Sequence, residues 1–281
     1  MFLKYERVEN GQAGLEEMVV NEISAAERRS QIAQLVLEQG KVTVAELVKK
    51  FQITETSIRR DLLLLEEDKH LKRVHGGAVS ISDNFRSETF SEKGKLHIQA
   101  KEKIGKYAVE LIQQGNIVLL DSGTTTLQIA RQMPANLRQN NHITLVTNSL
   151  PIAQEVLNWP SPNLTILGGI FLPDYQATVG PQTIALLRDL SADIAFLGAD
   201  GLTLTGGATT ANVLMAEVDR MMVERARKAV LVTDSSKIGR AGFVTIKPVS
   251  AFDLIITDDK APAEFVQTAT NMGIKVILVP D

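Results

Sequence analysis

The feature that most constrains this chain is a series of short apolar runs in its second half. Each run is rich in Val, Ile and Leu and alternates little with polar residues, and segments with helical spacing intervene. Strands of this kind are typical of a mainly parallel sheet that helices cover on both faces. The runs lie at residues 117–120, 143–146, 164–167, 194–197, 230–232, 254–256 and 276–279. This half is therefore predicted to be an α/β domain.

Composition places the chain among globular proteins. Of its 281 residues, 44% are hydrophobic and 22% are charged, which disfavours wholesale disorder and a fibrous repeat. The absence of cysteine excludes a disulfide scaffold, a thiolate metal site and a cysteine nucleophile. No apolar run approaches the roughly 20 residues of a membrane helix, and the N-terminal segment lacks the apolar stretch of a secretory signal. We therefore expect a cytoplasmic protein without a membrane partner.

Differences in residue pattern divide the chain into four segments. Residues 1–24 show no strong period and are predicted to be a flexible extension. Residues 25–80 are dense in charge and helical in pattern, residues 81–95 are a polar linker, and residues 96–281 hold the alternating strands and helices. The net charge of −3 gives no global sign of nucleic-acid binding, so such a role must depend on a local cluster of cations.

The charged segment has the pattern of a helix-turn-helix. Apolar spacing predicts a first helix over residues 25–39, which Gly40 ends, and a shorter helix with apolar residues from Val44 to Phe51. Thr54 is a natural N-cap for a third helix. The apolar stripe of that helix comprises Ile58, Leu62 and Leu65. Short helices joined by a turn of three or four residues are the helix-turn-helix arrangement.

Polar residues off this stripe gather near the start of the third helix, where a recognition helix contacts base edges in the major groove. Hydroxyl groups can contact bases or phosphates, and arginine can bind guanine or phosphate through two hydrogen bonds. The following run, residues 71–79, indicates a basic two-stranded wing with a turn at Gly76 and Gly77. The candidate DNA-binding residues are Arg28, Glu55, Thr56, Ser57, Arg59, Arg60, Lys72, Arg73 and His75.

Simpler interpretations stand beside this one. A single pair of arginines is usually a solvated helix face, so the DNA hypothesis depends on the helix spacing, the short turn and the basic wing together. Asp61 follows Arg60 directly. It either anchors the third helix or is a plain surface carboxylate.

Polar clusters follow the ends of several predicted strands, where parallel sheets bind their ligands. Residues 121–126 precede a helix, so their N–H groups and hydroxyls, with the positive end of the helix dipole, suit a phosphate. A well-capped helix start is the alternative. The cluster lacks the Gly-Lys-Ser/Thr end of a P-loop, which disfavours ATP and GTP. The candidate effector-binding residues are Asp121, Ser122, Gly123, Thr124, Thr125, Thr126, Asn148, Gly169, Asp200, Glu217 and Lys237.

Three of these residues come from later segments of the chain. Asp200 and Lys237 are suited to hold sugar hydroxyls or a phosphate. Glu217, on a predicted helix, reaches the same pocket or faces solvent, and both positions fit equally. The four histidines show no metal-ligand spacing, so we expect no metal and no cofactor.

Four motifs of the N-terminal segment form a recognisable set: Glu-Arg-Arg at 27–29 with Ile32, Val-Ala-Glu-Leu at 44–47, Thr-Glu-Thr-Ser-Ile-Arg-Arg-Asp-Leu at 54–62, and Arg-Val-His-Gly-Gly-Ala at 73–78. Together they resemble the DNA-binding signature of the DeoR family of bacterial transcription regulators. Ser57 stands where the family often has threonine, and residues 68–70 stand where it usually has a glycine before the wing. The segments from about residue 96 to 281 resemble the effector domain of the same family.

This resemblance implies an N-terminal winged helix-turn-helix and a C-terminal α/β Rossmann-like domain similar to ribose-5-phosphate isomerase. It implies that residues 121–126 form a phosphate loop, with Asp200 and Lys237 near the sugar. The expected function is a DNA-binding regulator, usually a repressor of sugar metabolism genes, whose binding to double-stranded operator DNA changes with a phosphorylated sugar effector. Operator symmetry implies a homodimer or homotetramer. The alternative is an enzyme, a phosphosugar aldose-ketose isomerase with Asp200, Glu217 and Lys237 as proton carriers.

Overall fold

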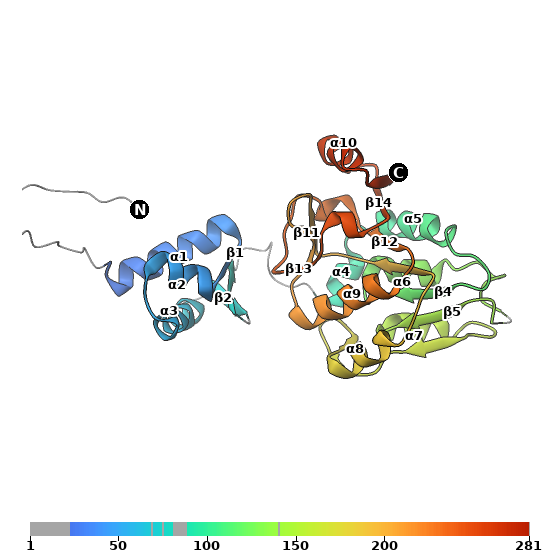
Figure 1. The fold of residues 1–281 in the computed structure, drawn as a ribbon, viewed down its shortest axis with the longest axis horizontal. Coiled ribbons are helices and arrows are strands. Elements are labelled where there is room, and N and C mark those ends of the chain that lie inside the picture. Colours follow the sequence, from blue (N-terminus) through green and yellow to red (C-terminus); the bar gives the residue numbers. More distant parts are fainter. Residues whose placement is uncertain (1–22, 69, 75, 81–88, 140, 281) are drawn as a thin grey trace, which may run out of the picture. The chain divides into compact units, whose positions relative to one another are not determined.

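The computed structural model describes residues 23–68, 70–74, 76–80, 89–139 and 141–280 (Figure 1). The chain forms two compact units that divide between Ile81 and Ser82. The expected extension at residues 1–24 lies almost wholly outside the described residues. In the described part of the chain, no helix is both long enough and apolar enough to cross a bilayer.

The N-terminal unit consists of three helices and a small antiparallel sheet. Its helices begin at hydroxyl N-caps, because the side chains of Ser24, Thr43 and Thr54 each accept a hydrogen bond from an N–H in the first turn. The left-handed conformation of Gly40 ends the first helix. The elements are α1 (Ala25–Gln39), β1 (Lys41–Thr43), α2 (Val44–Phe51), α3 (Glu55–Glu67), β2 (Leu71–Val74) and β3 (Gly77–Ser80). The sequence predicted all of them except β1.

Strand β3 of the wing lies in close contact with β1. The two strands pair antiparallel, with Thr43 opposite Gly77. A Cβ atom on Gly77 would lie 2.1 Å from the backbone oxygen of Val42, so a side chain at this position would separate the strands. Gly76 turns the chain between β2 and β3 with a φ of 84°. These two glycines therefore allow the turn of the wing and its close approach to β1.

The C-terminal unit is built on one seven-stranded parallel sheet in the order β15-β14-β12-β9-β4-β5-β6. All the apolar runs predicted from the sequence are strands of this sheet. Its strands are β4 (Ile117–Leu120), β5 (Thr144–Thr147), β6 (Leu164–Ile166), β9 (Ile194–Leu197), β12 (Ala229–Val232), β14 (Leu254–Asp258) and β15 (Lys275–Val279).

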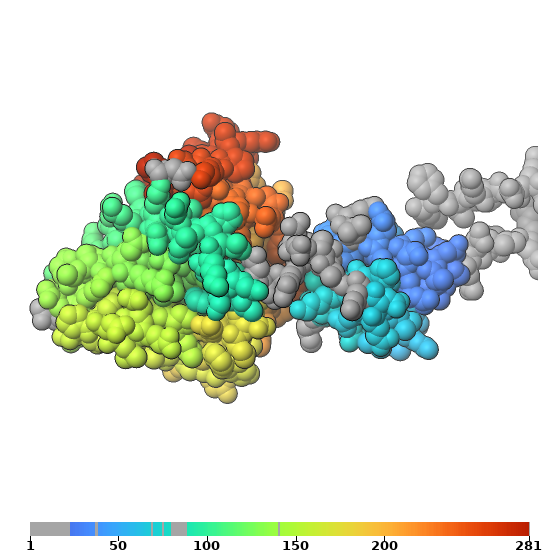
Figure 2. Space-filling model, turned by 180° about the vertical axis from the view of Figure 1, so that it is seen from behind, coloured from blue at the N-terminus to red at the C-terminus, as the bar shows by residue number. Residues whose placement is uncertain are grey.

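Helices pack on both faces of this sheet, which explains the continuous apolar runs. Successive side chains of a strand point to opposite faces. Accordingly Leu119 belongs to one core, whereas Val118 and Leu120 belong to the other. The first core includes α8 (Pro181–Arg188), α9 (Val213–Arg225) and α10 (Ala263–Asn271), and the second includes α5 (Ile98–Val109), α6 (Thr124–Arg131) and α7 (Leu150–Val156). Figure 2 shows the residues of α5 in green on the surface of the C-terminal unit, seen from behind.

Smaller elements lie outside the main sheet. They are the hairpin β7 (Ile170–Leu172) and β8 (Ala177–Val179), the antiparallel sheet of β10 (Gly201–Thr203), β11 (Gly207–Thr210) and β13 (Val244–Lys247), the short turns η1 (Ser235–Lys237) and η2 (Val249–Ala251), and helix α4 (Phe90–Lys95). The expectation of a linker over residues 81–95 is wrong for its last part, which is α4. Thr89 and Glu92 form a capping box that starts this helix.

Candidate functional site

The recognition helix α3 has one buried face and one exposed face, as the apolar stripe predicts. Ile58 is fully buried in the core of the N-terminal unit. Glu55, Thr56, Arg59 and Arg60 are exposed, and Ser57 is half-buried. The structure therefore brings these five candidate residues to the outer side of the first two turns of α3.

The two arginines of this face are available to a ligand in different ways. Arg59 forms an ion pair with Glu55, with 2.5 Å between Nη2 and Oε1, and both side chains are more than half exposed. An exposed pair of this kind contributes little stability and is readily exchanged for a phosphate. Among the described residues, Arg60 has no ion pair. Both guanidinium groups therefore suit contacts with DNA.

Arg28 is placed differently from the expectation. Its Nε lies 2.6 Å from Oδ2 of Asp61, and the Nη1 of Arg29 lies 3.7 Å from Oδ1. Asp61 is 3% exposed, and a buried carboxylate requires a counter-charge. The expectation that Arg28 contacts DNA is therefore replaced by a structural role. Of the two interpretations of Asp61, the anchor is correct, because this ion pair joins α3 to α1.

The wing carries two of the expected cations. Lys72 and Arg73 of β2 are both exposed. Arg73 is tied to α3, since its Nε lies 2.7 Å from Oε2 of Glu66 and its backbone N–H donates to Oε1. The hydrogen bond from the Arg73 side chain lowers the pKa of Glu66. His75, also expected at the DNA, lies outside the described residues.

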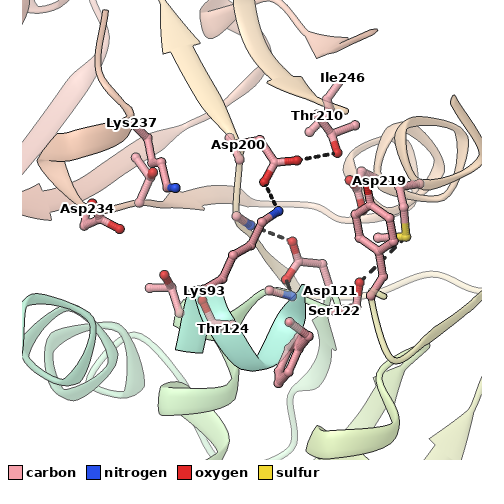
Figure 3. Close-up of a pocket in the computed structure, with 18 of the residues that line it drawn as sticks. Lys93, Asp121, Ser122, Thr124, Asp200, Thr210, Asp219, Asp234, Lys237 and Ile246 are labelled. Atoms are coloured by element: carbon pink, nitrogen blue, oxygen red, sulfur yellow. Dashed lines mark hydrogen bonds and ion pairs between the residues drawn. The ribbon is translucent and has the colours of Figure 1, made fainter. Parts of the chain in front are cut away.

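A pocket opens in the C-terminal unit where the carboxyl ends of β4, β9 and β12 meet (Figure 3). The strand order reverses between β4 and β9, and the crevice at such a reversal is where open α/β sheets bind ligands. The candidate residues that line the pocket are Asp121, Ser122, Gly123, Thr124, Thr125, Asp200 and Lys237.

The pocket lining does not include four of the candidate residues, which are Thr126, Asn148, Gly169 and Glu217. Thr126 is buried and donates to the carboxylate of Asp121, with 2.6 Å between oxygens. Asn148 is buried, and its Nδ2 donates to the Thr178 carbonyl. Gly169 packs closely, since a Cβ there would lie 2.3 Å from Oγ1 of Thr183. Thr126 therefore orients a pocket residue, whereas Asn148 and Gly169 hold loops.

Glu217 is exposed on α9, so its expected place in the pocket is wrong. The residues of α9 that line the pocket are Met215 and Asp219. Side chains four residues apart share a helix face, and a residue midway between them points elsewhere. Helical periodicity therefore places Met215 and Asp219 on one face and Glu217 off it, but only the fold shows that this face lines the pocket.

Other residues that line the pocket were not predicted from the sequence, among them Phe90, Lys93, Lys101, Asp174, Tyr175, Thr210 and Asp234. Lys93 lies on α4 within the expected linker. Its Nζ donates to Oδ1 of Asp200 and lies 5.5 Å from the ring centroid of Tyr175. No local pattern indicates this contact, because the two partners are 107 positions apart.

Two carboxylates hold the loops around the pocket, of which Asp121 is buried and Asp200 is half-buried. Asp121 accepts hydrogen bonds from the backbone N–H groups of Gly123 and Gly198, at 2.8 and 2.6 Å. Burial nevertheless raises the pKa of Asp121. Burial also opposes ionisation of Asp200, but the ammonium of Lys93 and hydrogen bonds that include one from Thr210 lower its pKa overall. Of these two carboxyl groups, Asp200 is therefore the one that more strongly favours the ionised form.

The start of α6 is open to an anion. Its N-cap is Gly123, which has no side chain to occupy the first N–H groups of the helix. Thr124 and Thr125 in its first turn line the pocket, as does Lys237 of η1. Free N–H groups, hydroxyls and an ammonium are the donors that bind phosphate groups. Among the described residues, no group of three or more His, Cys, Asp or Glu side chains is placed to hold a metal ion.

Comparison with known proteins assigns both units. The DeoR-like helix-turn-helix domain matches residues 28–84, and the DeoR C terminal sensor domain matches residues 96–259. The chain belongs to the DeoR family. A putative aga operon transcriptional repressor of Escherichia coli O157:H7 is 35% identical over 90% of this chain and 94% of that protein. HTH-type transcriptional regulator GlpR of Haloferax volcanii is 34% identical over 90% of this chain and 97% of that protein.

The glycerol-3-phosphate regulon repressor of Escherichia coli K12 is 28% identical to this DeoR-family chain over 90% of its length and 98% of that protein. Ribose 5-phosphate isomerase A of Methanocaldococcus jannaschii is 20% identical, with a TM-score of 0.36 over 49% of this chain and 53% of that chain. The relatives that match over nearly their whole length are transcriptional regulators. This DeoR-family protein is therefore a DNA-binding transcriptional regulator and not an isomerase.

Proposed function

We propose that this regulator represses genes of carbohydrate or polyol phosphate metabolism and releases its operator when a phosphorylated sugar or polyol binds the pocket. The observation that carries the proposal is the pairing of two kinds of group in one pocket. The uncapped start of α6 and Lys237 suit a phosphate, and the carboxylates of Asp121 and Asp200 suit hydroxyl groups. The names of two relatives, repressors of an aga operon and of a glycerol-3-phosphate regulon, support it.

Operator binding requires more than one copy of the chain. One helix-turn-helix contacts a half-site, so we infer a homodimer or homotetramer that acts in the cytoplasm on a symmetric operator. Within each copy, the DNA contacts come from the exposed face of α3 and from Lys72 and Arg73 of the wing. Sedimentation of the protein with and without operator DNA measures the number of copies bound.

The test of this function is a titration of sugar phosphates against a protein–DNA complex. Fluorescence anisotropy of DNA from upstream of the gene and its neighbours reports operator binding, and thermal shift reports ligand binding. A pentose, hexose or polyol phosphate that stabilises the protein and releases the DNA supports the proposal. Stabilisation by none of them, or release of DNA by the unphosphorylated sugars alone, contradicts it.

Replacement of Lys237 by alanine is expected to weaken binding of the sugar phosphate. A hydrogen bond to a charged group contributes about 1.5–3 kcal/mol, so the affinity falls roughly 10- to 150-fold. The matched control is Lys275→Ala on β15, whose exposed side chain lies outside the pocket lining. Isothermal titration calorimetry compares the two variants. Equal affinities would remove Lys237 from the phosphate site.

Helix α4 is the element through which we infer that the pocket acts on operator binding. It is the first helix of the C-terminal unit and begins at Phe90, after the boundary between the two units. Besides the Lys93–Asp200 pair, the buried Nζ of Lys101 donates to the carbonyl oxygens of Lys93 and Leu96, at 2.5 and 2.6 Å. A ligand that binds Asp200 or Lys93 breaks the ion pair between these two residues, and with it one of the contacts that hold α4 in place. Such a difference in contacts between two states is what allosteric coupling requires.

In Lys93→Gln, the effector is therefore expected to bind but no longer to release the operator. Glutamine keeps a donor for Asp200 but removes the charge. The ratio of operator affinities without and with effector, typically 5- to 150-fold in coupled systems, is expected to fall below about twofold. Lys95→Gln, an exposed position on the same helix, is the control. Undiminished release of DNA from the Lys93 variant would show that the signal does not pass through α4.

A further inference from the structure

Asp219 is a pocket carboxyl group whose chemistry the proposed site does not yet use. It lies on α9, lines the pocket with Met215, and is 3% exposed. Its Oδ1 is fully buried and has no hydrogen-bond partner among the described residues. Asp121 and Asp200, by contrast, each accept several hydrogen bonds from their loops.

Among the described residues Asp219 forms no ion pair, and the charge of the adjacent Arg220 offsets only part of the cost of its burial. Its neighbour Arg220 directs its guanidinium to β13, where Nε donates to the Ile246 carbonyl at 3.1 Å and Nη2 donates to the Thr245 carbonyl. The charged groups that act on Asp219 from facing elements, Asp121 after β4 and Asp200 after β9, are both acidic. Burial first, and then these two carboxylates, raise the pKa of Asp219 well above its usual value.

A buried carboxyl oxygen without a partner lowers the stability of a fold. An acid on the exposed side of α9, such as Glu217, carries no such penalty. The stability of α9 therefore gives no reason for an acid at the buried position 219. Such locally unfavourable residues are expected at functional sites. The missing partner is therefore best supplied by a ligand that enters the pocket.

We propose that Asp219 is a specificity-determining residue that binds a hydroxyl group of the phosphorylated effector. The inference rests on the proposed function of the pocket as a sugar phosphate site. Figure 3 shows Lys237 and Asp219 on opposite sides of the pocket, with Asp121 and Asp200 between them. The phosphate group lies at Lys237 and α6, and the far end of the carbon chain carries its hydroxyl group to Asp219.

This arrangement selects polyhydroxylated phosphate esters against inorganic phosphate and against deoxy analogues. A site built to hydrogen-bond a hydroxyl group rejects a ligand that lacks it, because the buried polar group then stays unpaired. Inorganic phosphate is too short to reach both sides of the pocket. It therefore gains nothing from Asp219.

The test uses full-length Asp219→Leu and Asp219→Asn variants, with Glu217→Gln on the same helix as the control. The probes are inorganic phosphate, glycerol 3-phosphate, ribose 5-phosphate, 2-deoxyribose 5-phosphate, glucose 6-phosphate and fructose 6-phosphate. For Asp219→Leu we expect at least tenfold weaker binding of the sugar phosphate that wild type prefers, and affinity for inorganic phosphate within twofold of wild type. Removal of the unpartnered carboxyl group is expected to raise its Tm by about 2–8 °C.

A weaker sugar phosphate affinity together with a higher Tm is expected only if Asp219 binds the ligand. A lower Tm for both Asp219 variants with unchanged sugar phosphate affinity would make Asp219 a structural residue and overturn the inference. Equal losses for inorganic phosphate and sugar phosphate would also overturn it, since the change would then act on the phosphate site. If wild type itself binds no sugar phosphate, the proposed function fails, and the inference about Asp219 fails with it. The result for wild type therefore distinguishes the two failures.

Discussion

Asp61→Ala is expected to unfold the N-terminal unit and abolish operator binding, while the C-terminal unit stays folded and keeps its affinity for sugar phosphates. Removal of one partner of a buried ion pair costs about 3–5 kcal/mol, because the remaining charge is left uncompensated. Here the remaining charges are Arg28, whose side chain is 15% exposed, and Arg29. A domain of this size has a small core, so the loss is a large share of its stability.

Two measurements check this outcome. Thermal unfolding followed by circular dichroism is expected to lose its N-terminal transition and to keep the C-terminal one. The matched control is Asp68→Ala at the C-terminal end of α3, where the aspartate is exposed and has no ion pair among the described residues. Full operator binding by Asp61→Ala would mean that the ion pair to α1 does not hold the recognition helix in place.

The double variant Arg59→Ala/Arg60→Ala is expected to lose at least about 30-fold in operator affinity with its fold intact. An arginine that binds a base or a phosphate contributes about 1–3 kcal/mol, so two together contribute at least about 2 kcal/mol. Both side chains are exposed, and the Arg59–Glu55 pair adds little stability. The salt dependence of binding is also expected to weaken, because fewer counterions are released.

Anisotropy titrations at several salt concentrations check this prediction. Lys49→Ala/Lys50→Ala provides a matched control, since it removes two exposed charges from α2 and leaves the recognition helix unchanged. The control is expected to lose several times less affinity at the same salt concentration. Equal losses for the two double variants would indicate a general electrostatic attraction and remove α3 from the role of recognition helix.

Local patterns were sufficient to predict most of the secondary structure. The bounds of α1 and α3 follow from Ser24, Gly40 and Thr54, which act on the backbone within a few residues. The strands of the large sheet were predictable because helices cover both faces, so most positions in the runs are apolar. The loop at residues 121–125 was predictable for a related reason, since it lies where a strand ends and a helix starts.

The residue pattern was enough to predict the two-domain organisation of helix-turn-helix and α/β sheet, and the order of elements that places polar loops at one edge of that sheet. Which polar groups meet depends instead on the tertiary structure. Arg28 pairs with Asp61 across 33 positions, and Lys93 pairs with Asp200 across 107. It also decided that Asp219 enters the pocket and Glu217 does not. The physical reason is that backbone preferences act over a few residues, whereas burial and charge pairing depend on what the fold brings within a few ångströms.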